Sequence, residues 1–184
     1  MRAGTTIRPA TVADVRGIAA IYRHYVTTSL ATFELVPPHE AEMAKRMAAI
    51  VDAKYPYLVA VADHDGDVLG YAYSGPFKPR EAYRFTTEES IYVRADAVGL
   101  GLGRALLRAV IEHATTQGLR QMVAVISDPG GPAGSKSVAL HVKEGFRAAG
   151  LLPNVGWKFG RWVDVATYVK PLADGAKSPP QAKL

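Results

Sequence analysis

The fold is decided by the stretch Ile91-Tyr-Val-Arg-Ala-Asp-Ala-Val-Gly-Leu-Gly-Leu-Gly-Arg-Ala-Leu-Leu107. Its β-branched beginning predicts a strand, and the helix formers after Gly103 predict a helix that starts at once. Glycine lets the backbone approach a ligand closely, and the free N–H groups of a first helical turn attract anions. The stretch therefore predicts either a turn that binds a pyrophosphate or a tight strand-to-helix turn that binds nothing.

Two common nucleotide motifs do not fit this turn. A dinucleotide fingerprint requires Gly-x-Gly-x-x-Gly. Counted from Gly99 the third place holds Arg104, and counted from Gly101 it holds Leu106. The P-loop requires Lys directly after Gly, but in Gly134-Ser-Lys-Ser137 a Ser stands between them. Both motifs are excluded.

The residues on either side of the turn predict a mixed α/β fold. Apolar periodicity and turn residues give the element order β-α-α-β-β-β-α-β-α-β-β. Strands are expected at about 5–8, 57–62, 68–73, 87–94, 122–126, 147–152 and 158–169, and helices at about 12–26, 38–51, 103–117 and 137–144. Residues 128–134 are expected to form a loop rich in Pro and Gly.

The chain of 184 residues predicts one domain with a sizeable core. We expect this domain to cover residues 1–171, because no internal repeat or composition shift divides them. Residues 172–184 lack apolar periodicity and are expected to be disordered.

Charge and composition narrow the class of function. The 22 Lys and Arg against 17 Asp and Glu give a net charge of +5, but the charges are scattered, which disfavours a nucleic-acid partner. Without Cys there is no thiolate site, and the His spacing predicts no metal. The longest apolar runs are too short to span a bilayer, and the start of the chain has no signal segment, so we expect a cytoplasmic protein without a membrane partner.

From Thr6 to about Pro171 the chain resembles the GNAT superfamily of N-acetyltransferases. In that family a Gln/Arg-x-x-Gly-x-Gly/Ala turn binds the pyrophosphate of CoA, and here Gly101 and Gly103 match while Val98 replaces the Gln or Arg. The resemblance implies a twisted, largely antiparallel sheet flanked by helices, with acetyl-CoA as co-substrate. It implies cofactor contacts from Ile91, Tyr92, Val93, Val98, Gly99, Leu100, Gly101, Leu102, Gly103 and Arg104.

Within that superfamily the chain resembles the phosphinothricin and methionine sulfoximine N-acetyltransferases. The similarity lies in residues 71–83, 86–93, 137–146 and 156–164. It implies direct transfer of an acetyl group, in a ternary complex, to the α-amine of a small amino-acid-like substrate, and it allows a homodimer. The alternatives are another amine (a polyamine, an aminoglycoside or a protein N-terminus) and a CoA-binding module without activity.

The resemblance also assigns chemistry to two side chains. Glu88 matches the family's catalytic carboxylate, which takes a proton from the attacking ammonium. Adjacent strand residues face opposite sides, so the neighbouring Glu89 is expected to point away from the substrate. His141 stands where many relatives carry a Tyr that protonates the departing thiolate, and it is either a proton donor or a structural residue.

The substrate is expected to meet the loop before the catalytic strand. There Arg80 matches a residue that grips a carboxylate, for which its planar fork is suited, and Lys78 is a weaker candidate. Candidate pocket walls, or alternatively plain core residues, are Phe33, Phe77, Tyr83 and Tyr92. After the next strand, Gly134 stands where relatives carry a CoA-binding Asn, so Ser135 or Ser137 is expected to take over that contact.

Overall fold

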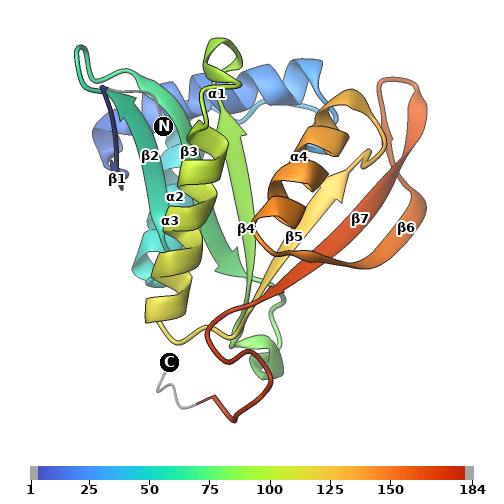
Figure 1. Cartoon of the computed structure of the whole chain (residues 1–184). Helices are drawn as coiled ribbons and strands as arrows, with labels where there is room; N and C mark the ends of the chain where they lie inside the picture. The colour runs from blue at the N-terminus through green and yellow to red at the C-terminus, as the bar shows by residue number, and fades with distance from the viewer. Residues whose placement is uncertain (1–3, 181–184) are drawn as a thin grey trace.

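The computed structural model describes residues 4–180, in which seven strands form one twisted sheet in the order β1-β2-β3-β4-β5-β7-β6 (Figure 1). Within this part of the chain, β4 and β5 pair in parallel and the other neighbours are antiparallel. The predicted mixed, largely antiparallel sheet is confirmed. The strands are β1 (Thr5–Pro9), β2 (Tyr57–Ala62), β3 (Val68–Pro76), β4 (Thr86–Val93), β5 (Gln121–Ser127), β6 (Arg147–Lys158) and β7 (Arg161–Pro171).

Helices cover both faces of the sheet (Figure 1). On one face, α1 (Val15–Thr28) and α2 (Glu40–Asp52) pack on the sheet. On the other lie α3 (Leu102–Thr116) and α4 (Pro132–Lys143). The apolar run of β2 is buried throughout because its alternate side chains enter the two cores. No helix in residues 4–180 has both the length and the apolar composition that a membrane span needs.

Two boundaries differ from the sequence prediction by five residues or more. Helix α4 begins at Pro132, five residues before the expected Ser137, because proline suits a first helical turn whose N–H groups have no partner. Strand β6 continues to Lys158, which was expected to lie in the following strand. A two-residue turn of Phe159 and Gly160, both at positive φ, then leads directly into β7.

Strands β4 and β5 separate part-way along their length. Their parallel pairing covers Thr86–Glu89 against Gln121–Ala124 and ends there. β4 continues to Val93 beside β3, and β5 continues to Ser127 beside β7. A V-shaped gap therefore opens in the middle of the sheet, facing α3 and α4 (Figure 1).

Residues 172–180 lie against the domain, although the sequence suggests a disordered tail from residue 172. Leu172 is buried in the core beside α3. Arg120 donates hydrogen bonds to the carbonyl oxygen of Gly175 and to both oxygens of Ser178. These contacts hold the segment in turns, while residues 181–184 lie outside the described part. The domain limits at 1–171 stay a prediction.

A buried carboxylate joins the first strand to the first helix. Arg8 donates to both oxygens of Asp14 at 2.8 Å, and the N–H of Thr11 donates to the same carboxylate at 2.7 Å. The hydrogen bond from Arg8 is the main reason that the pKa of Asp14 is lowered. The pair therefore favours the folded state wherever Asp14 is ionised.

We expect Asp14→Asn to lower the free energy of unfolding by about 1.5–3 kcal/mol at pH 7, since it removes hydrogen bonds to a charged group. Because the pKa of Asp14 is lower in the folded than in the unfolded protein, its carboxylate stabilises the fold at pH values above the unfolded-state pKa. This contribution is lost as the pH falls through the folded-state pKa. Urea unfolding at pH 7 and pH 3 should show that the difference in the free energy of unfolding between variant and wild type is smaller at pH 3. The exposed Asp52→Asn serves as the control. An equal gap at both pH values contradicts the assignment.

Candidate active site

The gap between β4 and β5 holds a cavity of about 660 Å³. Its walls come from β4, β5, the glycine turn, the start of α3, and α4. Most of the predicted cofactor residues line it: Ile91, Tyr92, Val93, Val98, Gly99, Gly101, Leu102, Gly103, Arg104 and Ser137. Its volume falls in the range of ordinary ligand sites. The residues that the sequence predicts to bind the cofactor thus lie mostly around one cavity.

Two of the predicted cofactor residues lie outside the cavity lining. Leu100 is half-buried and packs against the core beneath α3. Ser135 is exposed on the first turn of α4, whereas Lys136 and Ser137 beside it line the cavity. A side chain at Gly134 would collide with the backbone carbonyl of Asp128. An Asn at that position is therefore excluded by the local backbone.

The glycine turn has the backbone that an anion site requires. Gly99 (φ 90°) and Gly101 (φ 80°) are both in the left-handed region, which a side chain would strain. Gly101 is the N-cap of α3, so the first N–H groups of the helix, on Leu102, Gly103 and Arg104, lack helical partners. The turn thus presents backbone donors and the positive end of a helix to the cavity.

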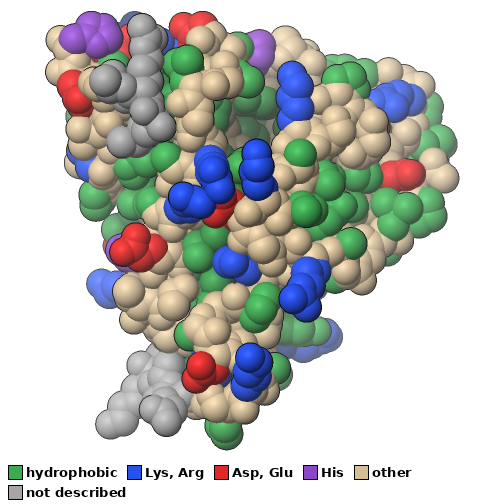
Figure 2. All heavy atoms as spheres, viewed as in Figure 1, with side chains coloured by type: hydrophobic (Ala, Val, Ile, Leu, Met, Phe, Trp, Pro, Cys, Tyr) green, Lys and Arg blue, Asp and Glu red, His purple; other side chains and the backbone are tan. Residues whose placement is uncertain are grey.

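Positive side chains surround this opening. Figure 2 shows Lys and Arg gathered on the face that carries α3 and α4. Arg104 and Lys136 line the cavity, and Arg104 shares the carboxylate of Glu144 with Arg108. A cavity with backbone donors and flexible cations is suited to an elongated, anionic ligand.

Glu88 lies on the opposite face of β4 from Glu89. It is half-buried and does not line the cavity, although Ser90 on the same face of the strand does. Burial raises the pKa of Glu88, and the charge of Glu89 raises it further, while Lys78 opposes both. A carboxylate with a raised pKa is a better proton acceptor near neutral pH.

Glu89, which the sequence left without a role, contacts His141. Its Oε1 lies 2.7 Å from Nε2 of the imidazole, and both side chains are about 95% buried and line the cavity. Nδ1 of His141 donates to the carbonyl oxygen of Ser137 at 2.7 Å. Sequence reasoning had no signal for this pair, because the two residues are 52 positions apart.

The loop between β3 and β4 carries most of the predicted substrate residues. Phe77 and Tyr83 meet edge to face with ring centroids 5.7 Å apart, and the ammonium of Lys78 lies 5.3 Å from the Phe77 ring. Arg80 is exposed and precedes a short 3-10 turn. Of the remaining candidates, Tyr92 lines the cavity, while Phe33 fills the space over Gly156 of β6.

The loop after α1 closes one side of the cavity, where Ala31 lines it. Ser127 at the end of β5 donates to the carbonyl oxygen of Leu30. Lys158 of β6 is buried and donates to the carbonyl oxygens of Ser29 and Thr32 at 2.8 and 2.7 Å. The sequence did not indicate these roles, which depend on residues brought together only by the sheet.

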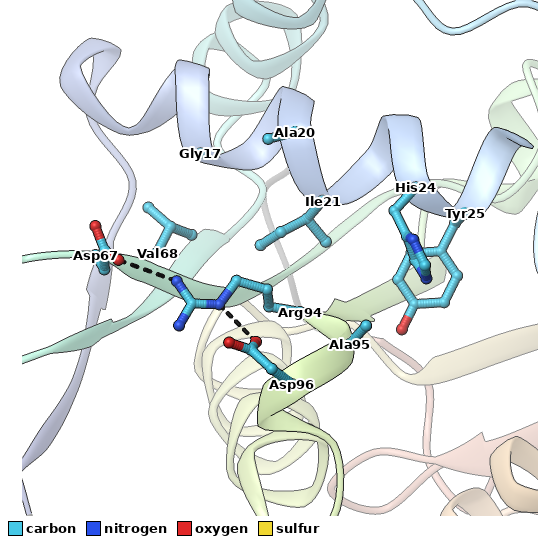
Figure 3. A pocket seen from close by; sticks show the side chains of 10 residues that line it. All are labelled: Gly17, Ala20, Ile21, His24, Tyr25, Asp67, Val68, Arg94, Ala95 and Asp96. Carbon is cyan, nitrogen blue, oxygen red and sulfur yellow. Dashed lines mark hydrogen bonds and ion pairs between the residues drawn. The ribbon is translucent and has the colours of Figure 1, made fainter. Parts of the chain in front are cut away.

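A second, smaller cavity of about 380 Å³ lies between α1 and the end of β4 (Figure 3). In it Arg94 extends between Asp67 and Asp96, with which it forms ion pairs at 3.1 and 2.7 Å. Tyr25 lines both cavities and donates from its hydroxyl to the carbonyl oxygen of Val93 at 2.7 Å. These contacts fix the chain where it leaves β4 for the glycine turn.

Comparison with known proteins identifies the family. Residues 7–167 match the sequence profile of the acetyltransferase (GNAT) domain. The chain belongs to the GNAT acetyltransferase family. The resemblance predicted from the sequence is confirmed.

Several GNAT relatives are similar over nearly the whole chain. A phosphinothricin N-acetyltransferase of Alcaligenes faecalis is 44% identical over 98% of this chain and 89% of its own length. A methionine sulfoximine/methionine sulfone acetyltransferase of Pseudomonas paraeruginosa is 43% identical over 95% of this chain and 98% of its own. A crystal structure of a phosphinothricin acetyltransferase from Sinorhizobium meliloti, in complex with acetyl-CoA, has a TM-score of 0.92 at 45% identity and covers 98% of this chain and 95% of its own.

Acetyl-CoA is the co-substrate of GNAT acetyltransferases, and the cavity fits it. The glycine turn supplies backbone donors for a pyrophosphate, and Arg104 and Lys136 supply positive charge. Among residues 4–180 no group of His, Cys, Asp or Glu is arranged to hold a metal ion. The bound thioester supplies the acetyl group, and the protein binds and orients it.

We expect Glu88→Gln to lower kcat by about two orders of magnitude near neutral pH, the usual contribution of a general base. The affinity for acetyl-CoA should hardly change, because Glu88 does not line the cavity. The pKa of Glu88 is raised, so wild-type kcat should fall as the pH drops through a value above the ordinary 4.5, and this acid limb should vanish in the variant. Steady-state kinetics from pH 5 to 9 measure both effects.

The exposed Glu112→Gln on α3 is the matched control for this prediction. It makes the same chemical change at an exposed residue that does not line the cavity, and it should leave kcat and its pH profile unchanged. A Glu88→Gln enzyme with wild-type kcat contradicts the role of Glu88 as the base.

Proposed function

We propose that the protein transfers the acetyl group of acetyl-CoA to the α-amine of a small amino-acid-like substrate of the phosphinothricin, methionine sulfoximine or methionine sulfone type. The observation that carries this proposal is the 43–44% identity, over at least 95% of this chain, to relatives with those activities in their names. The proposal includes a cytoplasmic location, because acetyl-CoA is made and used inside cells.

In this proposal the two faces of β4 divide the work. Acetyl-CoA lies in the cavity along β4, where backbone groups beyond Glu89 have no partner on β5. The N–H groups near Val93 stabilise the oxyanion that develops on the thioester carbonyl. Glu88 accepts a proton from the substrate ammonium, directly or through a water molecule, and the free amine attacks in the ternary complex.

The loop between β3 and β4 supports a substrate that carries a negative charge. Arg80 is exposed there and Lys78 is close enough to Glu88 to affect its pKa. We assign the binding of the substrate carboxylate to Arg80. The walls of the substrate pocket are assigned to four aromatic residues, Phe77, Tyr83, Phe33 and Tyr92. A cationic polyamine or aminoglycoside would meet like charge in this loop, which disfavours both.

Thiol release from acetyl-CoA in the presence of an amine panel tests the substrate class. The panel contains phosphinothricin, methionine sulfoximine, methionine sulfone, spermidine, an aminoglycoside and a peptide N-terminus. We expect kcat/KM to be highest for one of the three amino-acid analogues. Turnover of only the cationic amines or the peptide overturns the assignment, and binding of acetyl-CoA without turnover of any amine favours a CoA-binding module.

We expect Arg80→Ala to raise KM for the amino-acid substrate by about tenfold to a hundredfold, since a hydrogen bond to a charged group contributes about 1.5–3 kcal/mol. With the native enzyme, the methyl ester of the substrate should have a KM raised above that of the acid by about the same factor. With Arg80→Ala, the KM of the ester should rise little further. Arg80→Lys should rescue only in part, because an ammonium cannot form a bidentate pair. KM values for acid and ester with each enzyme measure this double-mutant cycle.

Arg84→Ala is the control for the Arg80 cycle, because this exposed residue of the same loop stacks on Phe85. It should affect acid and ester equally. If the native enzyme accepts the ester as well as the acid, Arg80 does not bind the carboxylate.

We also propose that the protein is a homodimer that associates through the β6–β7 hairpin. Trp157 and Trp162 face each other across this hairpin with their ring centroids 5.2 Å apart, and both side chains are more than half exposed. Leu151, Leu152 and Val155 of β6 are more than half exposed as well. An apolar patch of this kind on the edge of a sheet marks an interaction surface.

We expect the native protein to run as a dimer in light scattering coupled to size exclusion, and Trp162→Lys to run as a monomer. A charge placed in an apolar interface is left without a partner, which disfavours association. Val12→Lys, at an exposed apolar site on the first 3-10 turn, should stay dimeric. A native monomer contradicts the proposal.

A further inference from the structure

The buried pair of Glu89 and His141 joins the two walls of the cavity. Glu89 belongs to β4 and His141 to the last turn of α4, and both line the space between them. The Nε2–Oε1 distance is 2.7 Å, and the Phe146 ring packs edge-on against the imidazole at 5.0 Å. The ring is therefore fixed in position and orientation.

Both nitrogens of the His141 ring face oxygen acceptors. The carbonyl oxygen of Ser137, 2.7 Å from Nδ1, carries no hydrogen, so Nδ1 must carry one. Nε2 lies at the same distance from a carboxylate oxygen, and two lone pairs at 2.7 Å would repel each other. A second proton must therefore lie between Nε2 and Oε1, and the short distance is typical of a charge-assisted bond.

We propose that Glu89 is a positioning residue for acetyl transfer: it fixes the His141 ring and retains its second proton, so that His141 acts as a fixed imidazolium charge and not as the proton donor to sulfur. The inference rests on the proposed function of this cavity. It differs from one of the two roles that the sequence left open for His141, in which the ring protonates the departing thiolate.

The proton balance of the reaction does not require a donor at sulfur. The substrate ammonium gives one proton to Glu88, and its nitrogen forms the new bond to the acetyl carbon. The carbon–sulfur bond breaks with its electron pair on sulfur, and the second proton of the nitrogen passes to that sulfur, which leaves an amide and CoA thiol. A thiol has an ordinary pKa of about 8.5, so the thiolate is a good leaving group, and a nearby imidazolium stabilises its charge.

The charges around the pair support this division of roles. Burial alone lowers the pKa of His141, but the hydrogen bond and charge of Glu89, with the Ser137 carbonyl, outweigh it and leave the pKa raised. The charge of Glu89 also raises the pKa of three neighbouring groups: Glu88 and Tyr92 on β4, and Tyr73 on β3. Arg104 of α3 and Lys136 of α4 line the same cavity.

Nitrogen-15 NMR of the histidine rings, in the full chain without ligand, tests the proposal directly. We expect His141 to carry protons on both ring nitrogens at pH 7.5 in the wild type, and to lose one at lower pH in Glu89→Gln. Since Glu89 raises the pKa of His141, its removal makes the imidazolium a stronger acid. This readout is independent of the amine substrate, so its failure is distinguishable from failure of the proposed function.

Kinetics provide the second readout. We expect Glu89→Gln to lower kcat about tenfold, the effect of losing about 1.4 kcal/mol of transition-state stabilisation. The KM for acetyl-CoA should stay within about twofold, and the alkaline limb of kcat should move to lower pH. Glu89→Asp keeps the charge and should restore the alkaline limb in part, which a merely structural role would not do. Glu112→Gln is again the matched control.

Two results overturn the proposal. One is a wild-type His141 with a single ring proton at pH 7.5, which decides the matter even if Glu89→Gln does not fold. The other is a folded Glu89→Gln enzyme, intact by circular dichroism and acetyl-CoA binding, whose alkaline limb is that of the wild type.

Discussion

The end of hydrogen bonding between β4 and β5, at Glu89 and Ala124, is the constraint on which the rest of the structure depends. A parallel pair inside a sheet normally continues until both strands end, because each unpaired N–H or C=O group needs another partner. Here both strands go on past that point, supported by β3 on one side and β7 on the other. The gap is thus a binding slot whose lining is partly backbone.

Side chains from distant elements keep the gap open. Tyr25 of α1 binds the carbonyl oxygen of Val93 at the end of β4, and Ser127 at the end of β5 binds that of Leu30. The buried Glu89–His141 pair connects β4 to α4 across the cavity. The first contact satisfies the carbonyl group of Val93, which has no partner on β5, and the other two connect β5 to the loop after α1 and β4 to α4.

Local signals in the sequence predicted most of the fold and the glycine turn. The strand-turn-helix at 91–107 and the hairpin at 57–73 are each written in one continuous stretch, and both are present. The start of α4 was misplaced, because the run of Pro and Gly before Ser137 is equally typical of a loop. Glu89 was missed because its partner is 52 residues away, and a strand pattern indicates only a side chain's face.

The buried Lys158 has a consequence for the order in which the molecule assembles. Its ammonium is held by carbonyl oxygens 129 and 126 residues earlier in the chain, beside the loop that closes the cavity. A contact of such long sequence separation forms late, because the loop-closure entropy must first be overcome by nearer contacts. During synthesis the loop after α1 is therefore held in place only after the β6–β7 hairpin has formed. The enzyme acquires a complete pocket only when nearly the whole chain has been made.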